Sequence, residues 1–320
     1  MINRDQLAEV IGEWRTVVGS NPVLGEELTG RELWRVTATD GRRYFLKRLG
    51  PWRNLPPADE ARVLRWLSVN GVDVAEFMIT DRATVYAGAV EDCYVLIPAI
   101  VAHSLSPAEV LAGEEAVGRA IAGLHRALAR YPWSANSYTE QLGTALSGEL
   151  LLPDDVAAGF RTRRDGIIAA IEGLPLQLVH GDLTPANILL CRPGAVAGFI
   201  DFDHLPYAPR VWDLAKYLSR RLRRRWLEGE QQPTGRVDSI GPVLRGYHRH
   251  SPLTDSEREA LPAIILAANV IEASYAQRIA SGLLQRRMLP DHHLELADAV
   301  DAARWQLTHD DAVVEAVRRS

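Results

Sequence analysis

The spacing of apolar positions divides the chain near residue 98. Before that point, apolar and polar residues alternate in extended runs, most clearly over Leu33 to Thr39 and Arg43 to Leu49. Asp40-Gly41 joins these two runs and predicts a tight hairpin turn. Helical spacing over Ala58 to Asn70, ended by Gly71, predicts a helix after the hairpin.

Three further short runs complete this first part of the chain. Glu76 to Ile79, Thr84 to Tyr86 and Tyr94 to Ile97 are predicted strands, and Pro98 ends the last of them. The pattern therefore predicts a small β-rich N-terminal lobe over residues 1–97, built from strands around one helix.

The remaining residues, 98–320, are mostly helical by period. Glu114 to Tyr131 keeps its apolar residues on one face, a second helix is predicted near Val156 to Leu174, and helices dominate from Val211 onwards. Short strands return between Leu176 and Asp203. We therefore expect an α+β fold with two lobes, of which the C-terminal one is larger and mainly helical.

Composition excludes several classes of protein. The chain has 320 residues, of which 47% are hydrophobic, so it can bury a sizeable core and is not disordered as a whole. A net charge of −5 argues against a nucleic-acid partner. No apolar run approaches the length of a membrane span, and no signal peptide is visible. Cys93 and Cys191 lie far apart in apolar contexts, as buried thiols do in a reducing compartment. We expect a cytoplasmic protein, of oligomeric state left open.

The basic residues are almost all arginines. Of the 36 lysines and arginines, only Lys47 and Lys216 are lysines, each kept by chance or because a compact ammonium is needed. The densest charged run, Ser219 to Trp226, favours a solvated helix C-terminus, with a patch for an anionic partner as the alternative.

One stretch carries candidate chemistry. Within Leu178 to Leu190, His180, Asp182 and Asn187 have the spacing His-x-Asp-x-x-x-x-Asn, and Asp201 follows in the sequence Asp-Phe-Asp. A lone His-x-Asp pair is common and says little by itself. The joint pattern is far more specific.

A predicted hairpin brings these polar residues together. The runs Ile188 to Leu190 and Val196 to Ile200 are joined by the turn sequence Arg192-Pro193-Gly194. Asn187 precedes the first run and Asp201 follows the second, so both fall at one end of the hairpin, beside the aspartate of the motif. Carboxylate and amide oxygens suit Mg²⁺.

These residues resemble the catalytic core of the aminoglycoside phosphotransferase and choline kinase family, which are small-molecule kinases with a protein-kinase-like fold. The protein-kinase motif is H-R-D-x-x-x-x-N followed by D-F-G. Here Gly181 stands in place of the arginine and Asp203 in place of the glycine, and both departures point toward the small-molecule branch. That arginine typically reads a phosphorylated activation loop, so such control is not expected.

The resemblance extends over most of the chain. Its further segments are Tyr44 to Lys47, similar to the lysine-bearing strand; Tyr94 to Ile100, similar to the hinge; Ala120 to His125, similar to the long helix that opens the large lobe; and Pro209 to Ala215, similar to the segment of the anchoring aspartate. The last hundred or so residues match nothing specific, and in this family that region shapes the acceptor pocket.

The resemblance implies roles around the proposed reaction centre. Asp182 would orient the acceptor hydroxyl and take its proton, while Asn187 and Asp201 would hold Mg²⁺ on the phosphates of ATP. Asp213 would support the catalytic loop through hydrogen bonds, and His180 would be a scaffold residue.

The resemblance also implies a nucleotide site. Lys47 would contact the α- and β-phosphates and Glu60 would pair with it, although alone each is also typical of a solvent-facing residue. Gly30 would form the tip of the loop over the phosphates. The hinge proline lacks an N–H, so adenine would be bound by carbonyls and by the amides of Ala99 or Ile100.

We therefore predict a kinase that moves the γ-phosphate of ATP to a hydroxyl of a small molecule: an antibiotic, an amino alcohol, a sugar or a similar metabolite. Residues 241–320 hold no dense acidic cluster, which does not favour a strongly polycationic acceptor. Two rivals remain, a protein Ser/Thr kinase of the same fold and a nucleotide-binding pseudoenzyme.

Overall fold

The structure is a computed structural model of the whole chain. It describes residues 4–28, 32–50, 53–89, 92–133, 139, 142–223, 237–284 and 292–320. The chain divides into two compact units. The N-terminal unit comprises Met1–Val101, Tyr131–Ser137 and Gly198–Leu205, and the C-terminal unit comprises Ala102–Arg130, Tyr138–Ala197 and Pro206–Ser320.

A five-stranded antiparallel sheet forms the N-terminal unit, in the order β1-β2-β3-β5-β4. The strands are β1 (Val23–Glu27), β2 (Leu33–Thr37), β3 (Arg43–Leu49), β4 (Ala87–Ala89) and β5 (Asp92–Pro98), and the helices are α1 (Arg4–Ile11), the 3-10 turn η1 (Gly12–Trp14), α2 (Arg15–Val18) and α3 (Pro57–Val69). The predicted hairpin is confirmed, with Val36 opposite Tyr44 in an unbroken register. The predicted helix after it is α3.

Two strand predictions in this unit were wrong. Residues 76–79 form no strand; Met78 alone joins β5, through its N–H and the Leu96 carbonyl at 2.8 Å. The strand expected over residues 84–86 begins later, as β4. The reason is a closed turn, in which the Thr80 N–H donates to the Thr84 carbonyl at 2.8 Å and holds residue 84 out of the ladder.

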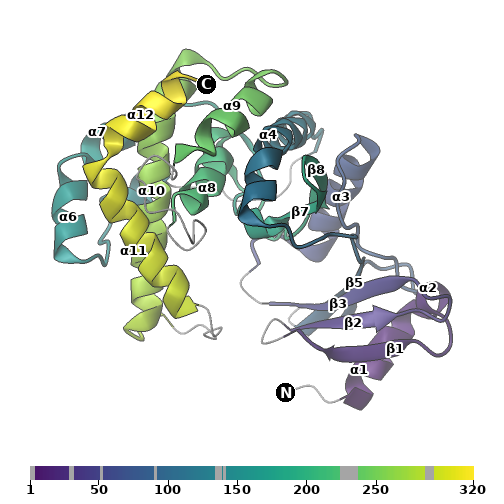
Figure 1. Cartoon of the computed structure of the whole chain (residues 1–320). Coiled ribbons are helices and arrows are strands. Elements are labelled where there is room, and N and C mark those ends of the chain that lie inside the picture. The colour runs from purple at the N-terminus through teal and green to yellow at the C-terminus, as the bar shows by residue number, and fades with distance from the viewer. Residues whose placement is uncertain are drawn as a thin grey trace. The chain divides into compact units, whose positions relative to one another are not determined.

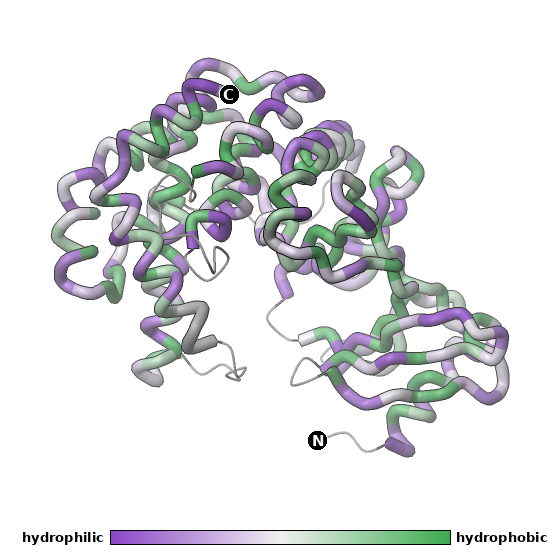
Figure 2. The backbone as a smooth tube through the Cα atoms, in the orientation of Figure 1, coloured by the Kyte–Doolittle hydropathy of each residue, from purple (hydrophilic) through white to green (hydrophobic). Residues whose placement is uncertain are grey.

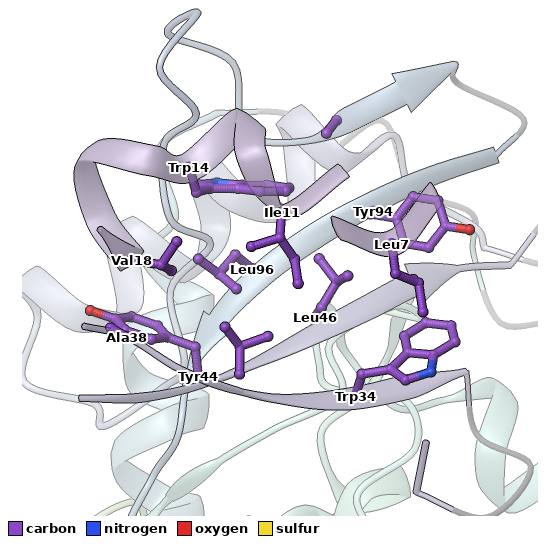
Figure 3. Packing of buried hydrophobic residues seen from close by; sticks show 12 residues of the cluster. Leu7, Ile11, Trp14, Val18, Trp34, Ala38, Tyr44, Leu46, Tyr94 and Leu96 are labelled. Atoms are coloured by element: carbon purple, nitrogen blue, oxygen red, sulfur yellow. The ribbon is translucent and has the colours of Figure 1, made fainter. Parts of the chain in front are cut away.

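The helices at the N-terminus cover one face of this sheet (Figure 3). Their apolar residues pack against alternate residues of the strands in a cluster made by Leu7, Ile11, Trp14, Val18, Trp34, Val36, Ala38, Tyr44, Leu46, Ala87, Tyr94 and Leu96. Side chains of a strand alternate between its two faces. Because Tyr44 and Leu46 point into this cluster, Lys47 lies on the opposite face of β3.

The C-terminal unit is mainly helical (Figure 1). Its helices are α4 (Pro107–Ala129), α5 (Leu142–Ser147), α6 (Asp154–Arg161), α7 (Arg164–Glu172), α8 (Val211–Arg221), α9 (Ile240–His248), α10 (Asp255–Ala280), α11 (His292–Thr308) and α12 (Asp310–Arg318). The expected α+β class, with an antiparallel sheet followed by a largely helical remainder, is confirmed.

Short strands bracket the motif region. β6 (Leu176–Leu178) pairs with β9 (Tyr207–Pro209), and the predicted hairpin is formed by β7 (Ile188–Arg192) and β8 (Ala195–Phe199). The single helix expected near residues 156–174 is instead two helices, α6 and α7. The Thr162 hydroxyl donates to the Gly159 carbonyl at 2.9 Å where α6 ends, a local bond that competes with helix continuation.

Two glycines allow α4 and α9 to pack backbone against backbone. A Cβ at Gly118 would overlap the carbonyl of Val243, and a Cβ at Gly246 would overlap the carbonyl of Glu115. This close approach fixes α9, and with it Tyr247, against the long helix that carries His125.

Helix α10 is long and carries an extended apolar stretch. By length and composition it could cross a bilayer, but 67% of its apolar 18-residue stretch is buried inside the structure, as in a core helix. Figure 2 shows polar and apolar positions interleaved along the helices around it.

Candidate functional site

The loop after β6 has a backbone shape that only a few residues allow. Gly181 has φ +84°, a left-handed conformation that favours glycine. The buried carboxylate of Asp213 accepts the backbone N–H of His180 at 2.8 Å and that of Gly181 at 2.9 Å. Gly181, which stands in place of the protein-kinase arginine, thus lies where the chain turns. Its N–H and that of His180 are both bound by the Asp213 side chain.

Asp213 is itself held from a second side. His125 Nε2 lies 3.0 Å from Asp213 Oδ2, and His125 Nδ1 lies 2.8 Å from the Tyr247 hydroxyl. All three side chains are buried. No recognised motif pointed to Tyr247, because α9 lies after the last motif segment, Pro209 to Ala215.

Asp182 and Asn187 share one corner of this loop. Asn187 Nδ2 donates to the Asp182 carbonyl at 2.8 Å and lies 3.4 Å from Asp182 Oδ2. With its nitrogen directed at Asp182, the Oδ1 atom of Asn187 is the one that could bind a cation.

Lys216 contacts the same aspartate. Its Nζ lies 3.1 Å from Asp182 Oδ1, and the two side chains are 16% and 35% exposed, respectively. Burial alone would lower the pKa of Lys216, but the charges of Asp182 and Glu272 outweigh it and raise that pKa, so the ammonium is charged. The rarity of lysine in this chain was the one signal that could have singled out this residue.

In the N-terminal unit, Lys47 forms an ion pair with Asp201. Burial would lower the pKa of Lys47, but the charges of Asp201, Asp203 and Glu60 outweigh it and raise that pKa. Asp201 has φ +68°, a left-handed conformation that is uncommon outside glycine and is tolerated by aspartate. Its side chain is 40% exposed and can be reached by a ligand.

The expected pairing of Lys47 with Glu60 was wrong. Glu60 pairs instead with Arg53, and both side chains are buried. Burial raises the pKa of Glu60 although Arg53 and Lys47 act to lower it. Arg53 lies in the segment that joins β3 to α3, and from there it contacts Glu60 on α3. Lys47 pairs with Asp201 instead.

The remaining predictions for the nucleotide site concern Ala99, Ile100 and Gly30, and their outcomes differ. The Ala99 N–H donates to the Arg43 carbonyl at 3.0 Å, so it continues the ladder beyond β5 and is not available to adenine. Of the two predicted hinge amides, Ile100 is the one that remains. Gly30 lies outside the described residues.

The basic run after residue 219 is not a solvated face where the structure describes it. Arg221 pairs with Glu114 at 2.8 Å, and these side chains are 3% and 0% exposed. Arg220 and Arg223 both pair with Glu272 of α10. The prediction failed because charge pattern alone does not show that acidic partners lie on neighbouring helices. Residues 224–226 lie outside the described residues.

The oxygen donors of Asn187 and Asp201 suit Mg²⁺, which substrate phosphates help to bind. They suit less well a metal ion that protein side chains alone must bind. The described residues contain no group of three or more His, Cys, Asp or Glu side chains that could hold a metal ion. Asn187 and Asp201 offer one amide and one carboxylate oxygen, which is the small protein share that Mg²⁺ takes when substrate phosphates and water complete its shell.

Comparison with protein families gives a match over most of the chain. The model of the phosphotransferase enzyme family, APH, matches residues 28–253. This range includes the whole motif region and both lysines.

Curated relatives match over shorter stretches. A homoserine kinase of Acidiphilium cryptum is 30% identical over 162 residues, which are 48% of this chain and 48% of that protein. A homoserine kinase of Zymomonas mobilis is 32% identical over 95 residues, or 30% of this chain and 28% of that protein. The chain thus spans less than half the length of these relatives.

Solved structures match over almost the whole chain. A microcompartment-associated aminopropanol kinase has a TM-score of 0.71 at 15% identity and covers 99% of both chains. An amicoumacin kinase in complex with AMP-PNP and Ca²⁺ has a TM-score of 0.69 at 16% identity and covers 97% of this chain and 94% of that one. At such identities the likeness shows the fold.

Proposed function

The chain belongs to the phosphotransferase enzyme family, and from this premise we propose that it transfers the γ-phosphate of ATP to a hydroxyl of a small molecule. The observation that carries the proposal is the loop around Asp182. Asp213 holds its backbone from behind, while Asn187 and Lys216 contact the Asp182 side chain or carbonyl from two sides. A carboxylate held in this way, and one-third exposed, suits a group that must meet a substrate hydroxyl.

The proposed reaction moves one phosphoryl group. The acceptor hydroxyl oxygen bonds to the γ-phosphorus, the bond from that phosphorus to the β,γ-bridging oxygen breaks, and ADP leaves. Asp182 orients the hydroxyl and takes its proton. Phosphoryl transfer needs positioning and charge neutralisation more than covalent catalysis, so one base and a few cations suffice.

The other groups act on the nucleotide. Lys47 contacts the phosphates, and Ile100 contributes its amide to adenine. Asn187 Oδ1 and the Asp201 carboxylate would hold Mg²⁺, which when bound neutralises phosphate charge. Lys47 and Asp201 neutralise each other in their ion pair, and both can turn to the phosphates and the cation.

The acceptor is a small molecule, which the names of the relatives support because they denote kinases of homoserine, of aminopropanol and of an antibiotic. The absence of the activation-loop arginine at Gly181 supports a small molecule over a protein. Since the reaction consumes ATP, we place it in the cytoplasm.

An acceptor panel tests the proposal. The protein is incubated with ATP, Mg²⁺ and single acceptors (homoserine, choline, simple sugars, aminoglycosides and nucleoside or peptide antibiotics), and products are read by mass spectrometry. We expect a phosphate-sized mass gain on at least one acceptor that is absent with Asp182→Asn. Phosphate appearing only on added protein would favour the protein-kinase rival, and lack of ATP binding would favour the pseudoenzyme.

A further inference from the structure

Lys216 contacts the proposed base and has more N–H donors than that contact uses. It comes from α8, while Asp182 comes from the loop after β6, and their charged atoms are 3.1 Å apart. An ammonium has three N–H donors, and Asp182 needs one of them. Because Asp182 is one-third exposed, a molecule whose hydroxyl reaches Asp182 also comes close to the Lys216 ammonium.

An aromatic side chain lies beside Lys216. Trp212 lies one turn earlier on α8, with its ring centre 5.9 Å from Lys216 Nζ. Its indole N–H is buried and makes no hydrogen bond to the described residues. The Lys216 ammonium, which has donors and no acceptor, favours a ligand that accepts hydrogen bonds.

The carboxylate of Glu272 does not reverse this preference. Glu272 of α10 acts on the charge of Lys216, but it is already paired with both Arg220 and Arg223. A carboxylate that faces two guanidinium groups offers little attraction to a cationic acceptor. The charges that flank Asp182 on this side therefore favour an anion.

We propose that Lys216 binds a carboxylate of the acceptor, so that the acceptor is a hydroxylated carboxylic acid such as a hydroxy amino acid. The inference rests on the proposed function, because it places the acceptor hydroxyl on Asp182. Phosphoryl transfer then proceeds with the same bonds formed and broken. Lys216 determines which alcohols are accepted, since an acceptor with only an ammonium near its hydroxyl meets a like charge there.

Acceptor pairs that differ only in the carboxylate test this. Homoserine is compared with the aminopropanol that lacks its carboxylate, serine with ethanolamine, and threonine with the corresponding amino alcohol. We expect at least one acid to be used with a kcat/KM at least about tenfold above that of its partner, as is typical when a charged group loses its counter-charge. A preference for the amino alcohols would overturn the proposal.

Variants of Lys216 separate carboxylate binding from an effect on Asp182. Lys216→Met should lower kcat/KM for every acceptor, because Lys216 contacts Asp182, but it should lower kcat/KM for the acid further and so remove the preference. Lys216→Arg should restore part of the preference because it keeps the charge. Arg249→Met is the matched control, since it removes one positive charge from the same unit at an exposed position on α9's C-cap. An equal fall for both members of a pair would mean that Lys216 only positions Asp182, and the proposal would be wrong.

A binding measurement covers the case in which Lys216→Met has no turnover. Calorimetry with a non-hydrolysable ATP analogue and Mg²⁺ should show the acid binding at least about tenfold more weakly to Lys216→Met than to Arg249→Met. Equal affinities would overturn the proposal. The acceptor panel distinguishes failure of the carboxylate inference from failure of the proposed kinase function. If an aminoglycoside or sugar gains phosphate and no hydroxy acid does, the carboxylate inference is wrong and the kinase function is retained. If no acceptor gains phosphate, both fall.

Discussion

The two lysines of the chain make the same kind of contact in different units. In the N-terminal unit Lys47 pairs with Asp201, and in the C-terminal unit Lys216 pairs with Asp182. The sequence motif identified both aspartates and Lys47, since each lies within a few residues of a recognisable pattern. It did not identify Lys216, which reaches Asp182 only because α8 folds back beside the loop. Motif spacing finds the carboxylates, whereas tertiary packing decides which cations they meet.

The two pairs also share a partial exposure that bears on their role. Their lysines are 28% and 16% exposed and their aspartates 40% and 35%. Ion pairs that solvent can reach contribute about 0–1 kcal/mol to stability. Substitutions in either pair should therefore change activity strongly and thermal stability little, unlike substitutions at the buried Asp213.

Asp201→Ala should give the largest effect on turnover. It removes the only carboxylate of the proposed Mg²⁺ pair, and a bound metal contributes several kcal/mol of charge stabilisation, so we expect a loss of about 10³-fold or more at saturating Mg²⁺. Steady-state rates over a Mg²⁺ titration measure it. Asp40→Ala, which breaks an exposed ion pair in the same unit, is the control. A near-normal rate for Asp201→Ala would remove the metal assignment.

Asp182→Asn comes next. The amide keeps the shape of the side chain but cannot take a proton, so kcat should fall by about 10²-fold or more with KM for the acceptor nearly unchanged. Unfolding temperatures of this variant and the parent should agree closely. If KM rose and kcat did not fall, Asp182 would bind the acceptor without serving as the base.

Lys47→Ala should act on the other substrate. Removing the ammonium should raise KM for ATP by about tenfold, the effect of one lost charge-assisted contact. Acceptor KM should change little. The two pairs would then divide the reaction, with Lys47 affecting ATP and Lys216 affecting the acceptor. Unchanged ATP kinetics would contradict the placement of Lys47.

Features determined by neighbouring residues were predicted from the sequence, whereas features determined by contacts between distant segments were not. The β2–β3 hairpin was predictable because alternation and Asp40-Gly41 are local signals. The burial of Arg221 was not, because Glu114 and Tyr217 reach it from α4 and from one turn earlier on α8. The split between α6 and α7 depended on one side-chain bond of Thr162, which periodicity does not register.

The same reasoning applies to the nucleotide site. The ladder-forming amide of Ala99 and the Arg53–Glu60 pair both follow from packing around β3, so a motif that places Glu60 in the right helix still misassigns its partner. Asp213 differs, because a carboxylate in the first turn of α8 can only accept hydrogen bonds, and the loop backbone offers the donors.

Glu60→Gln provides the smallest and most discriminating change. Because Glu60 pairs with Arg53 rather than Lys47, KM for ATP should change by less than about threefold, well below the effect of Lys47→Ala.

Burial raises the pKa of Glu60 in the fold, so the native state binds this proton more readily than the unfolded chain. The stability that this group contributes is thus present at low pH and is lost as pH rises through the folded-state pKa. Unfolding temperatures measured at pH values above the ordinary pKa of a glutamate should fall less steeply with pH in Glu60→Gln than in the parent. A rise in KM for ATP equal to that of Lys47→Ala would instead show that Glu60 supports the lysine in the nucleotide-bound state.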